Sequence, residues 1–280
     1  MRIPVNTNYK PCMLAITVQS KGQIEIRLRV AHAYQPNTDY TDRTGPVNGK
    51  QVFYVRMPIP PQTVVVQIYN KAIGDQQKGA DKTFDVVDYK IMELDTFPQI
   101  YDSKNPLIQE GVKFLKQFSE RAAILSAGHI GSVYQSDQKR FRIDYVDAIL
   151  DRRETILTKD GKEVPNPRLG EEQSTPARIS RDRGIIEWAK PACLKYAVPY
   201  RFGITCHEIG HFYINENPRD EFEADRNGIK IMIGCGFGFI DACDAFLSVF
   251  EGSPSDQNAQ RTNQVIQLVT ELDNKYNRYK

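Results

Sequence analysis

Hydrophobic and polar residues alternate along the first third of the chain. From Gln23 to Val30 every second residue is aliphatic and the residues between are Gln, Glu or Arg, which is typical of an antiparallel strand with one buried face. Similar runs predict further strands at residues 13–19, 51–57, 63–69 and 83–93. Residues 35–50 are rich in Pro, Gly, Asn and Asp and predict a loop. This pattern favours an all-β sandwich or barrel over residues 1–95.

The pattern changes after residues 96–106, a segment with two prolines that is the candidate linker. From Leu107 to Leu125 apolar residues recur every three or four positions, which predicts an amphipathic helix that stops near Gly128. Strands are then expected at residues 140–150, 153–158 and 178–190, a long polar loop at 158–177, and helices at 200–213, from 220, at 239–250 and at 258–279. The expected fold class is α+β, with an N-terminal β module followed by an α+β domain at residues 107–280.

Composition narrows the function classes. The chain has 280 residues, a net charge of +2 and no dense cluster of Lys and Arg, so neither a nucleic acid nor an anionic membrane is an expected partner. Five cysteines are scattered without a C-x-x-C pair, which favours free thiols in a reducing compartment. The sequence shows no secretory signal and no apolar run long enough for a membrane span, so a cytoplasmic location is expected.

One stretch carries candidate chemistry. Residues 206–212 contain the pattern H-E-x-x-H, formed by His207, Glu208 and His211. On a helix, His207 and His211 lie one turn apart on the same face, so both imidazoles can bind one ion. Glu208 lies beside them, where a carboxylate can take a proton from water that Zn²⁺ acidifies to a pKa of about 7. The pattern indicates hydrolysis with Zn²⁺ as cofactor and Glu208 as the catalytic base.

A second helix is predicted to begin nine residues after His211. One face of it carries Glu221, Ala224, Asp225 and Gly228. Because Ala224 and Gly228 are small, this face can lie close to the histidine helix and bring Glu221 within ligand distance. We therefore predict Glu221 as the third ligand, and Asp225 as a carboxylate that holds a histidine N–H or pairs with a base such as Arg226. Two histidines and one carboxylate are typical of a catalytic zinc site.

The motifs H-E-I-G-H at residues 207–211 and E-F-E-A-D-R at residues 221–226 resemble the gluzincin branch of zinc metallopeptidases. The second motif is similar to the heat-shock and CAAX-processing proteases, and the short gap between the motifs is closer to small soluble gluzincins of the ImmA type. The resemblance implies a zincin-like domain with metalloendopeptidase activity on a peptide or protein substrate. It also implies that the strand at residues 178–190 forms a sheet edge to which an extended peptide adds.

Other interpretations of these residues stay open. The two histidines can be packed core residues, or the chain can be a structural or assembly component of a larger particle such as a phage virion, with a silent or single-use zinc site and a β module that binds a protein partner. A non-proteolytic amidase, with Cys193 in place of Glu221 as a ligand as in peptide deformylases, is a further alternative. The candidate donors to an oxyanion are Tyr196, Tyr200, Tyr213 and Arg226.

Overall fold

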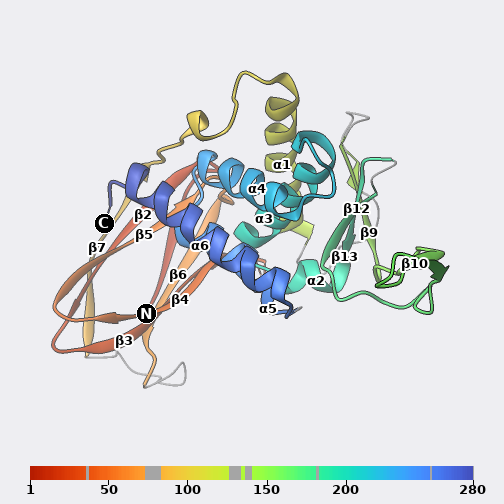
Figure 1. Cartoon of the computed structure of the whole chain (residues 1–280). Coiled ribbons are helices and arrows are strands. Elements are labelled where there is room, and N and C mark those ends of the chain that lie inside the picture. Colours follow the sequence, from red (N-terminus) through yellow and green to blue (C-terminus); the bar gives the residue numbers. More distant parts are fainter. Residues whose placement is uncertain are drawn as a thin grey trace.

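The computed structural model describes residues 1–35, 38–72, 83–125, 134–135, 141–180, 183–252 and 254–279. Within these ranges an all-β region is followed by a region of helices that also carries a four-stranded sheet and a hairpin (Figure 1). The α+β fold class is therefore confirmed.

The N-terminal region is a sandwich of two antiparallel sheets. Its strands are β1 (Arg2–Asn6), β2 (Cys12–Ser20), β3 (Ile24–His32), β4 (Asp39–Val47), β5 (Lys50–Met57), β6 (Thr63–Asn70) and β7 (Phe84–Glu93). One sheet has the order β1-β6-β3-β4 and the other the order β5-β2-β7. Aliphatic residues of both sheets, such as Ile16 of β2 and Leu28 of β3, form one buried cluster. Two facing sheets around a shared core make a sandwich rather than a closed barrel.

The sandwich corrects part of the sequence prediction. The loop predicted at residues 35–50 is wrong, because β4 occupies much of it and pairs along β3, and β1 was not predicted at all. On β4, Asp42 accepts a hydrogen bond from Arg27 Nε at 2.6 Å and Asp39 accepts one from Arg29 Nε at 3.0 Å. These cross-strand ion pairs hold a strand whose own sequence lacks a hydrophobic run.

The C-terminal region contains most of the helices. They are η1 (Pro98–Ile100), α1 (Pro106–Leu125), α2 (Lys190–Lys195), α3 (Val198–Ile209), the π-helical turn η2 (Gly210–Ile214), α4 (Glu221–Gly234), α5 (Phe239–Glu251) and α6 (Asp256–Tyr276). The predicted stop near Gly128 lies outside the described residues. Among the helices that the structure describes, none has both the length and the hydropathy that crossing a bilayer requires.

The strands of this region differ from those predicted. They are β8 (Tyr134–Gln135), β9 (Arg142–Val146), β10 (Thr155–Leu157), β11 (Glu163–Pro165), β12 (Ala177–Ser180) and β13 (Ile185–Ala189), and the larger sheet has the order β12-β13-β9-β8. The single strand expected at residues 178–190 is wrong: Gly184, with a φ of 66°, lies in a turn that separates β12 from β13. The loop predicted at 158–177 likewise contains β11, which pairs with β10 across Gly161. Consequently, of β12 and β13, β12 lies at an edge of the sheet and β13 lies inside it.

Several contacts attach the helices to the sandwich. The buried Arg56 of β5 donates from Nε to the carbonyl of Gly236 at 2.9 Å, after the end of α4. Near its C-terminal end α6 lies close to the sandwich, with the rings of Tyr279 and Tyr54 4.8 Å apart. In the expected linker, Phe97 is buried and its N–H bonds to the carbonyl of Gly234 at 2.8 Å. The boundary at residues 96–106 stays a prediction, and the two regions are packed together.

Candidate metal centre

Small residues let helices α3 and α4 approach closely. A Cβ atom on Gly210 would lie 3.1 Å from the Cα of Ala224, and one on Gly228 would lie 3.1 Å from the backbone nitrogen of His207. Larger side chains at these positions would push the helices apart. The expected packing of the Ala224 and Gly228 face against the histidine helix is confirmed. The N-cap of α4 is Asp220, whose side chain accepts a hydrogen bond from the N–H of Glu223 at 3.0 Å.

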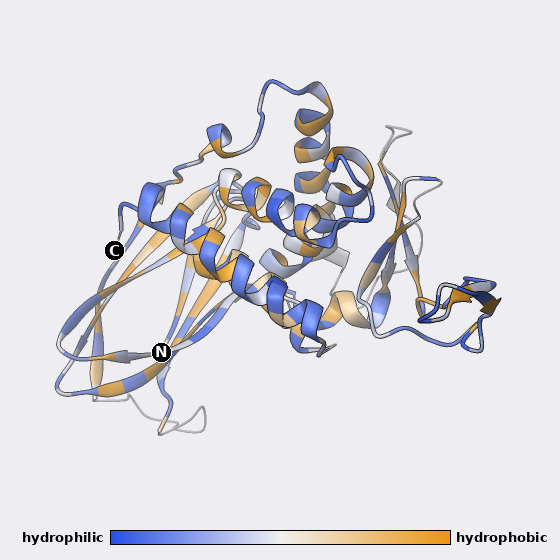
Figure 2. Ribbon diagram, in the orientation of Figure 1, coloured by the Kyte–Doolittle hydropathy of each residue, from blue (hydrophilic) through white to orange (hydrophobic). Residues whose placement is uncertain are grey.

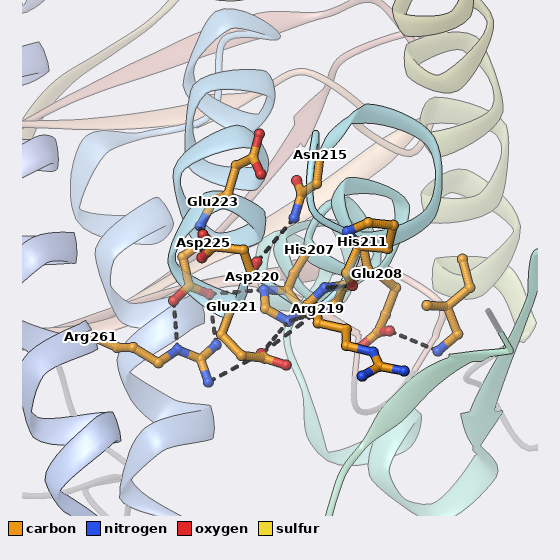
Figure 3. A network of polar contacts seen from close by, with 12 residues as sticks. His207, Glu208, His211, Asn215, Arg219, Asp220, Glu221, Glu223, Asp225 and Arg261 are labelled. Carbon is orange, nitrogen blue, oxygen red and sulfur yellow. Dashed lines mark hydrogen bonds and ion pairs between the residues drawn. The ribbon is translucent and has the colours of Figure 1, made fainter.

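Three ligand atoms converge where these helices meet. The Nε2 atoms of His207 and His211 are 2.9 Å apart, and Oε2 of Glu221 lies 3.4 Å from each of them (Figure 3). A tetrahedral zinc ion with bonds of about 2.0–2.1 Å separates its ligand atoms by roughly 3.3 Å. The structure thus brings together the three predicted ligands: both distances to Glu221 match this spacing, and the two imidazole nitrogens lie closer together than it.

Both imidazoles are oriented through their other nitrogen. Nδ1 of His207 lies 2.8 Å from Oδ1 of Asp225, and Nδ1 of His211 lies 3.0 Å from the carbonyl oxygen of Pro218. An acceptor at Nδ1 favours the tautomer with its proton there, which leaves the Nε2 lone pair for a metal. Two such lone pairs at this separation repel each other unless a cation lies between them. The donor set therefore fits a bound metal ion.

Asp225 has a second partner besides His207. Its carboxylate, which is 3% exposed, accepts hydrogen bonds from Nε and Nη2 of Arg261 at 2.7 and 2.8 Å. The Cζ atom of this guanidinium lies over the ring of Phe250, 4.4 Å from the centroid of the ring. Asp225 thus contacts a histidine and pairs with a base, and the base is Arg261 of α6 rather than Arg226.

Arg261 is the site residue that the sequence analysis missed. Its Nη1 lies 3.4 Å from Oε2 of Glu221, so it is close to the candidate ligands themselves. On α6 it precedes the buried Val265 by one helical turn and lies on the same face as Val269. Figure 2 shows α6 as a mostly hydrophilic helix with hydrophobic positions between the hydrophilic ones. The sequence does contain one signal for it: Arg261 is a cation on the packing face of a helix, and a cation in such a position requires a buried partner. The sequence did not show which carboxylate that partner is.

The carboxylates of the centre favour a positive charge between the candidate ligands, either a proton or a metal ion. Burial of His207 opposes its charged form, yet its contacts with Asp225 and Glu221 raise its pKa to about 10. Burial also opposes ionisation of Glu221, but the two imidazoles hold its pKa well below the usual range. The pKa of Asp225 is lowered against the effect of its burial by Arg261 and His207. Metal binding would replace a proton at this centre, as is usual for histidine ligands.

Glu208 and the ligands line one cavity of about 500 Å³. Glu208 is 8% exposed, and its Oε2 accepts a hydrogen bond from the backbone N–H of Ile179 on β12 at 2.7 Å. The edge strand therefore fixes the orientation of the proposed base. The remaining lining includes an apolar set from α3 and α5, formed by Ile204, Ala245, Phe246, Val249 and Phe250.

The other sequence candidates lie elsewhere. Among the described residues that line this cavity there is none of the predicted oxyanion donors, Tyr196, Tyr200, Tyr213 and Arg226. Tyr213 instead donates its hydroxyl to the carbonyl of Gly184 at 3.2 Å. Cys193 is fully buried on α2. Within the described part of the chain, the group that can hold a metal consists of His207, His211 and Glu221, without Cys193.

Comparisons of this chain with protein-family models, with curated proteins and with solved structures give no match. The gluzincin resemblance, the zinc ion and the activity therefore stay predictions after these comparisons.

Proposed function

We propose that this chain is a zinc-dependent metallopeptidase that hydrolyses bonds in peptide or protein substrates. One observation supports this most: three ligand atoms lie 2.9, 3.4 and 3.4 Å from one another, with both imidazoles held through Nδ1. Structural zinc sites use four protein ligands and catalytic sites three. The described residues supply three ligands, and these lie next to a cavity, so a catalytic zinc site is favoured over a structural one.

Each site residue has a role in this proposal. His207, His211 and Glu221 would hold the ion, which would supply a Lewis acid that acidifies water to a pKa of about 7. The carboxylate of Glu208 accepts a proton from the attacking water and donates it to the leaving nitrogen. The N–H of Ile179 occupies Oε2 of Glu208 and leaves Oε1 for proton transfer. Asp225 keeps His207 in the tautomer that binds metal.

An extended peptide suits the cavity. β12 lines it and is an edge strand, which pairs with β13 alone among the described strands. A peptide can add to such an edge through main-chain hydrogen bonds. We include a cytoplasmic location in the proposal, because all five cysteines are free thiols and such thiols persist in reducing compartments.

The test combines a metal analysis with one substitution. The purified chain is expected to hold one zinc ion and to cleave members of a peptide library. Glu208→Gln should keep the zinc and lose about 10²–10⁴-fold in turnover, because it removes the proton acceptor and keeps the shape. His207→Ala is the matched control and should lose zinc and turnover together.

Two outcomes would count against the proposal. Stoichiometric zinc without turnover on any peptide would favour the alternative of a structural or assembly protein. A chain that binds no zinc at neutral pH would overturn both interpretations and leave the histidines as core residues.

A further inference from the structure

One edge of the sandwich combines unpaired backbone with exposed apolar side chains. β7 has 10 residues and no proline, and among the described strands it pairs with β2 alone, at the left-hand edge of the sandwich in Figure 1. Its residues Val87, Tyr89 and Ile91 are 56%, 44% and 50% exposed. Proteins usually protect edge strands by shortening them, covering them, or placing proline, charged residues or a bulge there. Of these devices β7 has charged residues and a bulge. Its length and its exposed apolar row nevertheless suit the addition of another strand.

The register shows that part of this apolar row belongs to the inner face of the sandwich. Tyr89 lies opposite Ile16 and Ile91 lies opposite Leu14, and both partners are core residues. Tyr89 also lines a small hollow beside Ile3 of β1, the edge strand of the facing sheet. Asp88 and Lys90 alternate with this row and so point to the outer face. A strand added beside β7 would cover the row.

We propose that the strand added is β7 of a second copy of this chain, antiparallel to the first and centred on Tyr89. In this register Val87 lies opposite Ile91 and Asp88 lies opposite Lys90, each pair occurring twice by symmetry. Side chains that lie directly opposite each other point to the same face of a sheet. The register can therefore shift only in steps that keep inner-face residues opposite inner-face residues. The two neighbouring registers place like charges together: one places Asp88 opposite Asp88 of the other copy, and the other places Lys90 opposite Lys90 of the other copy. Charge complementarity therefore selects the register about Tyr89.

Both charged residues are available for a partner. Within one chain Nζ of Lys90 lies 3.5 Å from Asp88, and their side chains are 71% and 50% exposed. An ion pair this exposed is weak, so exchanging it for two pairs between copies loses little. Val87 is a β-bulge residue that lies between Val86 and Asp88 and has no partner on β2, so the regular pairing proposed for the dimer ends there and does not extend to Asp85.

The experiment uses complementary charge reversals in the full chain. Asp88→Lys leaves two cations at these positions and Lys90→Asp leaves two anions, so each variant opposes like charges twice in its own dimer. By sedimentation equilibrium, the wild type should have twice the 32.0-kDa chain mass and each variant the mass of one chain. An equimolar mixture of the two variants should return to the mass of two chains, because both pairs are restored.

Two controls separate this proposal from a general effect of charge. Glu25→Lys reverses another exposed strand acid, which has Lys71 at 3.3 Å, and should remain dimeric. The double variant with both Asp88→Lys and Lys90→Asp should also dimerise. A monomeric wild type, a single reversal that stays dimeric, or a mixture that stays monomeric would overturn the proposal. Circular dichroism of each variant checks that the sandwich is folded, and the proposal does not depend on zinc.

Discussion

Two arginine–aspartate pairs of this protein have similar geometry and opposite surroundings. On the sandwich, Arg27 binds Asp42 through two nitrogens with the side chains 41% and 30% exposed. Beside the candidate metal centre, Arg261 binds Asp225 through two nitrogens with the side chains 11% and 5% exposed. Water screens the first pair, and such pairs contribute at most about 1 kcal/mol. The second pair loses its hydration, which only close geometry and additional hydrogen bonds offset.

The difference indicates what each pair does. The exposed pair joins neighbouring strands β3 and β4 and helps a polar segment to pair. The buried pair also orients a candidate ligand, since Asp225 contacts Nδ1 of His207. A buried ion pair is weak evidence of stabilisation, so its location beside the candidate ligands is better explained by orientation of the candidate metal centre.

The largest expected effect comes from breaking the buried pair. Arg261→Met takes from the buried Asp225 the guanidinium that binds it through two nitrogens, and we expect the metal-free protein to lose about 3–5 kcal/mol of unfolding free energy. Urea-induced unfolding of the chelator-treated protein measures this loss. Adding Asp225→Leu removes the stranded carboxylate and should recover much of it. A loss below about 1 kcal/mol for Arg261→Met would mean that the buried pair behaves like the exposed one.

The pH dependence of stability sharpens the same comparison. The pKa of His207 rises from about 6.5 in an unfolded chain to about 10 in the folded one. The protonated imidazole therefore stabilises the metal-free fold fully below pH 6.5, and this contribution is lost as pH rises towards 10. Unfolding of the metal-free protein measured at several pH values in this window should show decreasing stability. Asp225→Asn should reduce the slope and Asp42→Asn should leave it unchanged.

A smaller effect is expected on metal affinity. Asp225→Asn keeps the shape and removes the negative charge next to His207, so zinc affinity should fall about 10–100-fold, as for other residues that orient metal ligands. Competition with a chromogenic chelator measures the dissociation constant. An unchanged constant would show that Asp225 contributes to packing alone.

The smallest effect is expected on the sandwich. Asp42→Asn removes the charge from the exposed pair, and the unfolding free energy should change by at most about 1 kcal/mol and less at high salt. Urea unfolding at two ionic strengths tests this. A larger loss that persists in salt would show that β4 depends on this pair more than its exposure indicates.

The sequence predicted those structural features that depend on residues close together along the chain. The strands β2, β3, β5, β6 and β7 follow from alternation, and the meeting of His207, His211 and Glu221 follows from helical spacing and two small residues. The missed features depend on distant partners. β4 pairs along β3, which also supplies Arg27 and Arg29 for its aspartates, and Arg261 reaches an aspartate 36 residues away in sequence. No local pattern contains that information.

The last helix links the two regions physically. Arg261 near the start of α6 contacts Asp225, and Tyr276 at its end lies 5.3 Å from the ring of Phe97, beside the sandwich. During synthesis the residues of α3 and α4 leave the ribosome before those of α6. Asp225 therefore meets its guanidinium partner only after α6 has left the ribosome and docked, so the candidate metal centre reaches the arrangement described above late in synthesis.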